Sequence, residues 1–228
     1  MNIIRTLDII LAIIALIFLS PLFLLVMILL AFTGERKIIF MQARVGKNLK
    51  EFSVIKFVTM QENSEKIGTG TITMRNDPRV LPLGRFLRAS KINELPQLIN
   101  IVLGEMSLIG PRPLTHQSLP SLPAGELESI LSVPPGLSGI ASIILYNEEE
   151  ILPPGDKGLI FYRDVIAPYK AALDLWYSKN ETPLVYLFLI AATVLRLMLK
   201  EKFDIYKFLV DLPKRPINLE VQVEDLQL

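Results

Sequence analysis

Cysteine is absent from this sequence of 228 residues, and histidine occurs only once, at His116. The absence of cysteine excludes disulfide bonds, catalytic thiolates and zinc sites built from thiolates. His116 lies in a loop rich in proline and serine and has no partner motif nearby, so the pattern does not favour a general base. The formal net charge is only +1, and no overall field would attract a polyanion. Nucleic acid is therefore not an expected partner.

Apolar residues make up 51% of the chain, and they are unevenly distributed. They concentrate between Leu7 and Phe32 and again between Pro183 and Leu199. Both runs predict contact with a membrane. The length of the chain suits one domain of ordinary size together with a membrane anchor.

The N-terminal apolar run fits two membrane topologies. About 25 apolar residues could cross a hydrocarbon core about 30 Å thick. Ser20 and Pro21 stand at its centre, and proline removes a backbone donor there, so the helix must kink or break. Each arm of about 12 residues would reach about 18 Å, close to half the bilayer core. A re-entrant hairpin would place Arg5 and the basic residues that follow the run on the cytoplasmic side together.

The middle of the chain mixes strand and helix patterns. Ile38 to Gln42 and Phe52 to Met60 read as a short β-hairpin. Gly84 to Ser90 reads as one or two helical turns that bring Arg85 and Arg88 together at three-residue spacing. We therefore expect an α+β fold, mainly helical, with a small mixed globular domain over residues 35–182.

The stretch from Lys91 to Leu103 carries apolar residues at helical spacing. Asn93 stands at its N-cap and Glu94 in its first turn, which is a good helix start in its own right. A helix N-terminus with a carboxylate, near Arg85 and Arg88, also suits a phosphate and a divalent cation. The residues alone leave both interpretations open.

The C-terminal third predicts surface contact with the membrane. The apolar run from Pro183 to Leu199 is too short for a comfortable span and carries Arg196 near its end, so we expect interfacial amphipathic helices over residues 183–212. Residues 213–228 alternate apolar and polar side chains around Ile217 and Leu219, as an edge strand does.

Several motifs together resemble the bacterial sugar transferase family, in the short form of the monotopic polyprenol-phosphate phosphoglycosyl transferases. The matching segments are Gln42 to Lys47, Lys56 to Met60, Asp77 to Arg79, Gly84 to Arg88, Lys91 to Pro113, Pro135 to Gly139 and Leu173 to Tyr177. The resemblance covers roughly residues 3 to 200. Members of this family are anchored by a re-entrant helix broken at a Ser-Pro pair, which Ser20 and Pro21 match. The resemblance thus favours the hairpin, with residues 1–34 as the anchor.

The resemblance implies a two-step transfer at the cytoplasmic face of the bacterial inner membrane, at the start of glycan or polysaccharide assembly. An Asp of an Asp-Glu pair attacks a nucleotide diphosphate sugar, expected to be a UDP-sugar, and polyprenol phosphate then accepts the phosphosugar. Glu94 matches the second acid and is the expected ligand of Mg²⁺. The residues expected to bind substrate are Lys56, Arg85, Arg88 and Arg112 for the phosphates, and Pro111, Arg112 and Pro113 for the nucleotide side. Membrane lipids are further partners, and a homo-oligomer is left open.

The sequence departs from the family pattern at the attacking residue, because Asn93 stands where the family has the nucleophilic Asp. A carboxamide is neutral, its nitrogen lone pair is delocalised, and it forms no mixed anhydride with phosphate. Val58 and Pro134 also replace arginines of the pattern. Three hypotheses follow: an active transferase, a catalytically silent relative that binds nucleotide sugar or lipid, and a membrane scaffold for a glycan-assembly partner.

Overall fold

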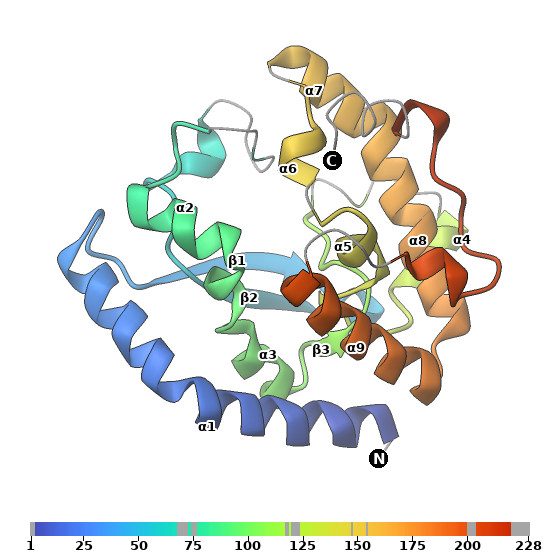
Figure 1. The fold of residues 1–228 in the computed structure, drawn as a ribbon, viewed down its shortest axis with the longest axis horizontal. Helices are drawn as coiled ribbons and strands as arrows, with labels where there is room; N and C mark the ends of the chain where they lie inside the picture. The colour runs from blue at the N-terminus through green and yellow to red at the C-terminus, as the bar shows by residue number, and fades with distance from the viewer. Residues whose placement is uncertain are drawn as a thin grey trace.

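The longest element is α1, a helix from Ile3 to Phe32 that runs along one side of the molecule (Figure 1). The computed structural model describes residues 3–67, 73, 77–116, 119, 124–146, 148–153, 155–199 and 204–219. One face of α1 is buried, at positions four residues apart, and the opposite face exposes isoleucine, leucine and phenylalanine. The helix is long and apolar enough to cross a membrane. Its exposed apolar face indicates membrane contact, because soluble proteins rarely expose so large an apolar surface to water.

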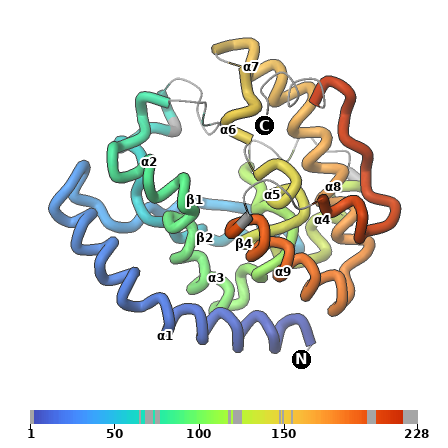
Figure 2. The backbone as a smooth tube through the Cα atoms, viewed as in Figure 1, coloured from blue at the N-terminus to red at the C-terminus, as the bar shows by residue number. Residues whose placement is uncertain are grey.

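The α1 helix continues through Pro21, but its direction changes near the middle (Figures 1 and 2). Because Pro21 has no N–H, the carbonyl of Ile17 loses its usual partner four residues ahead. The hydroxyl of Ser20 donates to that same carbonyl at 2.8 Å. The serine thus supplies the hydrogen bond that the proline removes, and the helix bends at this pair without ending. The re-entrant hairpin itself stays a prediction.

Two small sheets lie above α1. Strands β1 (Ile39–Val45) and β2 (Glu51–Phe57) form the expected antiparallel hairpin, joined through the single turn η1 (Lys47–Leu49). Strands β3 (Ser107–Ile109) and β4 (Gly136–Ser138) pair in parallel. A Cβ atom at Gly110 or Gly136 would collide with the backbone of the other segment, so glycine permits this close approach.

The remaining regular elements are helical and mostly short. They are η2 (Ser64–Lys66), α2 (Pro82–Ala89), η3 (Ile92–Glu94), α3 (Gln97–Leu103), α4 (Ala124–Ile130), α5 (Ile140–Ile144), α6 (Glu148–Ile151), α7 (Asp156–Phe161), the π-helical turn η5 (Tyr162–Ile166), α8 (Ala167–Asn180), α9 (Pro183–Leu199) and η6 (Ile205–Lys207). The mainly helical fold with a small sheet is therefore confirmed.

The globular part is fastened to α1 at two places. Arg5 donates to the carbonyls of Ile101 and Val102 at 2.5 and 3.0 Å, and so caps the C-terminal end of α3. The carboxylate of Asp8, which is 2% exposed, accepts from the hydroxyl of Ser107 at 2.9 Å and from the backbone of Leu108 at 2.8 Å. The anchor and β3 are therefore held in one fixed relation.

The C-terminal third differs in part from expectation. Helix α9 buries Tyr186, Leu189 and Ala192 completely and exposes Leu184 and Met198 on its other side. The described part of 201–212 contains only the single turn η6, because Asp204 caps a turn at Tyr206 where a long helix was predicted. Residues 220–228, most of the predicted edge strand, lie outside the described residues.

Candidate functional site

Lys56 and Glu94 form an ion pair, with 2.7 Å between the Lys56 Nζ and Glu94 Oε1 atoms. Lys56 comes from β2 and Glu94 from η3, whose position is set by the buried side chain of Asn100 on the following helix. The Asn100 amide accepts from the backbone of Ile55 at 3.1 Å and donates to the carbonyl of Ser53 at 2.8 Å. Helix α3 is therefore fixed against β2, and the ion pair is preorganised.

Electrostatics keep Glu94 anionic. Burial alone would raise the pKa of its carboxyl group, but the charges of Lys56 and Arg112 and the hydrogen bond from Lys56 outweigh burial and hold the pKa at about 2. Burial lowers the pKa of Lys56, while the Glu94 carboxylate opposes that change. The site thus holds a carboxylate and cations together at neutral pH.

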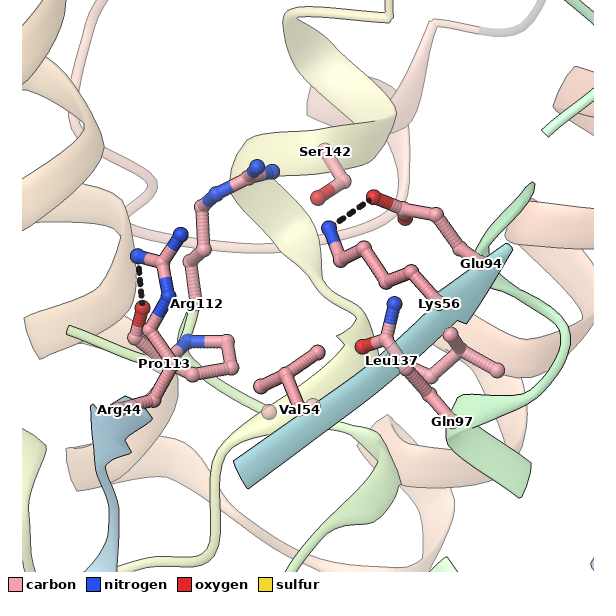
Figure 3. A pocket seen from close by; sticks show the side chains of 11 residues that line it. Arg44, Val54, Lys56, Glu94, Gln97, Arg112, Pro113, Leu137 and Ser142 are labelled. Atoms are coloured by element: carbon pink, nitrogen blue, oxygen red, sulfur yellow. Dashed lines mark hydrogen bonds and ion pairs between the residues drawn. The ribbon is translucent and has the colours of Figure 1, made fainter. Parts of the chain in front are cut away.

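Arg112 faces this pair from the loop after β3 (Figure 3). Its side chain is exposed to the groove. Burial by the surrounding protein lowers the pKa of the Arg112 guanidinium. The negative charges of Glu94 and Glu148 raise this pKa by more, so the net shift is upward. Pro111 accepts from the backbone of Gly136 at 2.8 Å, and Pro113 accepts from the Arg44 guanidinium at 3.2 Å. These bonds hold the loop in place.

A small chamber lies between Lys56 and Arg112. It has about 20 Å³ of free space, enough for one water molecule, and it shares Lys56, Glu94 and Arg112 with the lining of an open groove of about 1470 Å³. The chamber is lined by Arg44, Val54, Lys56, Glu94, Gln97, Gly110, Arg112, Pro113, Gly136, Leu137 and Ser142 (Figure 3). Since single-ligand pockets reach about 1,000 Å³, the groove has room for two substrates.

The other predicted site residues line the same groove. Arg85 and Arg88 lie on α2, and Asn93 precedes Glu94 on η3. Asn93 is 6% exposed, and its Oδ1 atom has no hydrogen-bond partner in the described part of the chain. The structure therefore brings the predicted substrate-binding and catalytic residues together around the groove. Pro111 is the exception, because it is buried within the loop that carries Arg112. The individual roles of these residues stay predictions.

Sequence reasoning missed the far wall of the groove. Glu148 pairs with Lys170 at 2.7 Å, and both side chains line the groove. Beside it, burial raises the pKa of the Asp174 carboxyl group to about 7, and the nearby charge of Lys170 and the backbone N–H of Arg112 offset burial only partly. Two signals pointed to Asp174: it shares a helix face with Lys170 at four-residue spacing, and it lies in the Leu173 to Tyr177 segment that resembles the family.

The metal expectation can be compared with the available ligands. Among the described residues, no group of three or more His, Cys, Asp or Glu side chains could hold a metal ion alone. Mg²⁺ commonly binds one or two carboxylates and completes its shell with substrate phosphates and water. Glu94 is such a carboxylate, and the neighbouring Asn93, whose buried Oδ1 atom has no hydrogen-bond partner among the described residues, also lines the groove. The donor set fits Mg²⁺ when a substrate supplies phosphate oxygens.

The fold and site together define a membrane-associated protein with a basic groove around a carboxylate. The model of the bacterial sugar transferase family matches residues 1–200. The chain is 35% identical to the exopolysaccharide production protein ExoY of Sinorhizobium fredii over 204 residues, which are 83% of each chain. The chain belongs to the bacterial sugar transferase family, and the resemblance drawn from its motifs is confirmed.

Two longer relatives carry more specific names. The chain is 32% identical to the undecaprenyl-phosphate glucose phosphotransferase of Komagataeibacter xylinus, over 77% of this chain and 32% of that protein. It is also 32% identical to the undecaprenyl-phosphate galactose phosphotransferase of Salmonella typhimurium, over 84% of this chain and 40% of that protein. The family is therefore one of transferase enzymes.

Proposed function

We propose that this protein transfers a sugar phosphate from a nucleotide diphosphate sugar, with a UDP-sugar as donor, to polyprenol phosphate. The reaction takes place at the cytoplasmic face of the bacterial inner membrane and begins glycan or polysaccharide assembly. The observation that carries the proposal is the Lys56–Glu94 pair facing Arg112 in a groove large enough for two substrates. Relatives named as undecaprenyl-phosphate phosphotransferases support it.

The site residues stabilise charge on the donor. Transfer breaks the bond between the bridging oxygen of the diphosphate and the phosphorus that carries the sugar, and the nucleoside monophosphate leaves with the bridging oxygen and the electron pair of that bond. Lys56 and Arg112 bind the phosphate oxygens on which negative charge is concentrated. Mg²⁺, held by Glu94, would supply further neutralisation of the diphosphate. The acceptor phosphate oxygen finally bonds to the phosphorus that carries the sugar.

The anchor completes the proposal. We infer that α1 enters the membrane and returns at Ser20 and Pro21, so that Ile3 and Lys47 both lie on the cytoplasmic side as a monotopic anchor. The bend at this pair and the long exposed apolar face of α1 support this topology. The exposed face of α9 would then rest on the same membrane surface.

Asn93 favours a second function, because a carboxamide forms no covalent phosphosugar intermediate. A protein with the same groove and no nucleophile would bind the nucleotide sugar or the lipid without turnover, or serve as a scaffold for a glycan-assembly partner. The substrates are the same in the first alternative, and only the transfer is lost.

The full chain in lipid nanodiscs, given UDP-sugars and undecaprenyl phosphate, separates these functions. Release of UMP that depends on the lipid phosphate supports the transferase. The matched control is Glu94→Gln, which keeps the size of the side chain and removes its charge. UDP-sugar binding without UMP release identifies the silent binder. Absence of both binding and release rejects the proposed function.

A further inference from the structure

The aromatic ring of Tyr146 lies between two cations from distant parts of the chain. The Lys91 Nζ atom is 5.4 Å from the ring centroid, and the guanidinium carbon of Arg196 is also 5.4 Å from it. Lys91 caps η3, whereas Arg196 lies near the end of α9. All three side chains line the large groove. The ring attracts both cations and so holds two like charges near each other.

Lys91 adopts a backbone conformation that suits a functional role. Its φ of 58° lies in the left-handed region, which is uncommon for residues other than glycine and costs conformational energy. This conformation turns the chain between α2 and η3. The charge of Lys91 also contributes to the lowered pKa of Glu94. The Tyr146 cluster, comprising Lys91, Tyr146 and Arg196, therefore borders the Lys56–Glu94 centre.

The α9 wall beside this cluster is apolar. Ile190, Val194 and Leu197 line the groove together with Arg196, and Val194 and Leu197 are 50% and 43% exposed. The end of α9 that carries them lies toward the middle of the molecule, next to α5 (Figure 1). A ligand here meets two cations and a hydrocarbon surface. A phosphate monoester on a long apolar chain has both complementary parts, whereas a free nucleotide sugar lacks the second.

We propose that Lys91 and Arg196, held on the ring of Tyr146, bind the phosphate of the polyprenyl phosphate acceptor, with its first isoprene units against Val194 and Leu197. This inference rests on the proposed function, in which a lipid phosphate must reach the transferred phosphosugar. Lys56 and Arg112 in the groove serve the donor, and the Tyr146 cluster serves the acceptor. The acceptor phosphate then lies beside Glu94, close to the phosphorus atom that its oxygen must reach in the transfer.

Direct binding tests this assignment without requiring turnover. Undecaprenyl phosphate bound by the full chain in detergent micelles is measured by native mass spectrometry, and UDP-sugar binding is measured separately by calorimetry. Arg196→Gln should weaken lipid phosphate binding by about tenfold or more, as expected for one lost charge-assisted contact. UDP-sugar binding should stay unchanged, and Arg196→Lys should restore most of the lipid affinity.

The matched control is Arg215→Gln, because Arg215 also lies over a tyrosine ring, at 5.3 Å from Tyr206, but does not line the groove. It should bind undecaprenyl phosphate like the unaltered chain. Farnesol, which lacks the phosphate, should bind the unaltered chain and Arg196→Gln equally weakly. Equal loss in both arginine variants, or loss of UDP-sugar binding alone in Arg196→Gln, would overturn the assignment. Failure of the proposed function is distinct, since lipid phosphate would then bind while UDP-sugar did not.

Discussion

The hydroxyl of Tyr186 donates to Asp8 Oδ1 at 2.7 Å, which joins α9 to α1 across 178 residues of sequence. The same carboxylate oxygen accepts from Ser107 and from the backbone of Leu108. Asp8 thus connects the anchor, the last long helix and the strand that leads into the Arg112 loop. Loss of this carboxylate should therefore disturb β3 and, through it, the loop that positions Arg112 in the groove.

Tyr186→Phe should lower the free energy of unfolding by about 1 kcal/mol, the usual net value of one hydrogen bond. Asp8→Leu should cost considerably more, because it leaves Ser107, Leu108 and Tyr186 with buried donors and no acceptor. Thermal unfolding in detergent measures both changes. Tyr162→Phe is a matched control for the loss of a tyrosine hydroxyl, because the Tyr162 hydroxyl makes no hydrogen bond among the described residues. Equal stability of Asp8→Leu and the unaltered chain would contradict this role for Asp8.

Asp174 should make the stability depend on pH. Its folded-state pKa of about 7 lies above its ordinary value of 3.8, because burial disfavours the charged form. A raised pKa contributes stability that is fully present below about pH 4 and is lost as pH rises through about 7. Asp174→Asn removes this titration. The melting temperature of the unaltered chain should therefore fall relative to that of Asp174→Asn between pH 5 and 8. Parallel curves of melting temperature against pH for the two chains would exclude a raised Asp174 pKa.

Residues close in sequence could be predicted, and contacts between distant segments could not. The hairpin of β1 and β2 follows from local turn chemistry and strand patterns, and the helical periodicity predicted α3. The predicted start of α3 was wrong, because the helix begins at Gln97 after Pro96, and Asn93 lies in the separate turn η3 with no hydrogen bond to its Oδ1 atom among the described residues. Motif resemblance predicted Lys56, Glu94 and Arg112 as one site. The contacts of Asp8 with Tyr186 and of Arg196 with Tyr146 join segments that are far apart in the sequence, with several helices between them. No periodicity encodes such pairs. Within the described residues 204–212, a cap at Asp204 forms a single turn where the apolar pattern had predicted part of an amphipathic helix.

Lys56→Met should change how the protein responds to acid. In the folded protein the pKa of Glu94 is held at about 2, below its ordinary 4.5. A depressed pKa contributes stability that is present above about pH 4.5 and is lost as pH falls toward about 2. Without Lys56 the Glu94 pKa should rise, and this contribution should shrink. Any stability advantage of the unaltered chain over Lys56→Met should therefore diminish between pH 5 and pH 3 in equilibrium unfolding.

Pro21→Ala should let α1 straighten toward a membrane span. Alanine restores the N–H that can bond to the Ile17 carbonyl, so the cause of the bend is removed. Because the chain has no native cysteine, single replacements Ile3→Cys and Lys47→Cys report topology by labelling from each side of vesicles. Both sites should be labelled from the cytoplasmic side in the unaltered chain. If they are found on opposite sides there, the re-entrant anchor is wrong. Unchanged topology in Pro21→Ala would instead assign the bend to packing against the globular part.

Asn93→Asp should be necessary for appreciable transfer through a covalent intermediate. The substitution places a carboxylate beside Glu94, where Lys56, Lys91 and Arg112 already favour negative charge. Asn and Asp have nearly the same size, and the Asn93 Oδ1 atom makes no hydrogen bond among the described residues that the substitution would break, so the fold should be kept while the reactive group appears. The full chain should gain UMP release and a phosphosugar adduct on residue 93, detectable by mass spectrometry after rapid quenching.

The comparison of rates locates the attacking group. If the Asn93 chain releases UMP as fast as Asn93→Asp, residue 93 is not the nucleophile, and Glu94→Gln in the Asn93 background should then abolish release. If Asn93→Asp gains no activity but binds UDP-sugar, the losses at Val58 and Pro134 become the cause, because arginines of the family pattern are missing there. Restoring them as Val58→Arg and Pro134→Arg together with Asn93→Asp should then recover transfer, since each adds a cation for the diphosphate charge that builds up as the phosphorus–oxygen bond breaks.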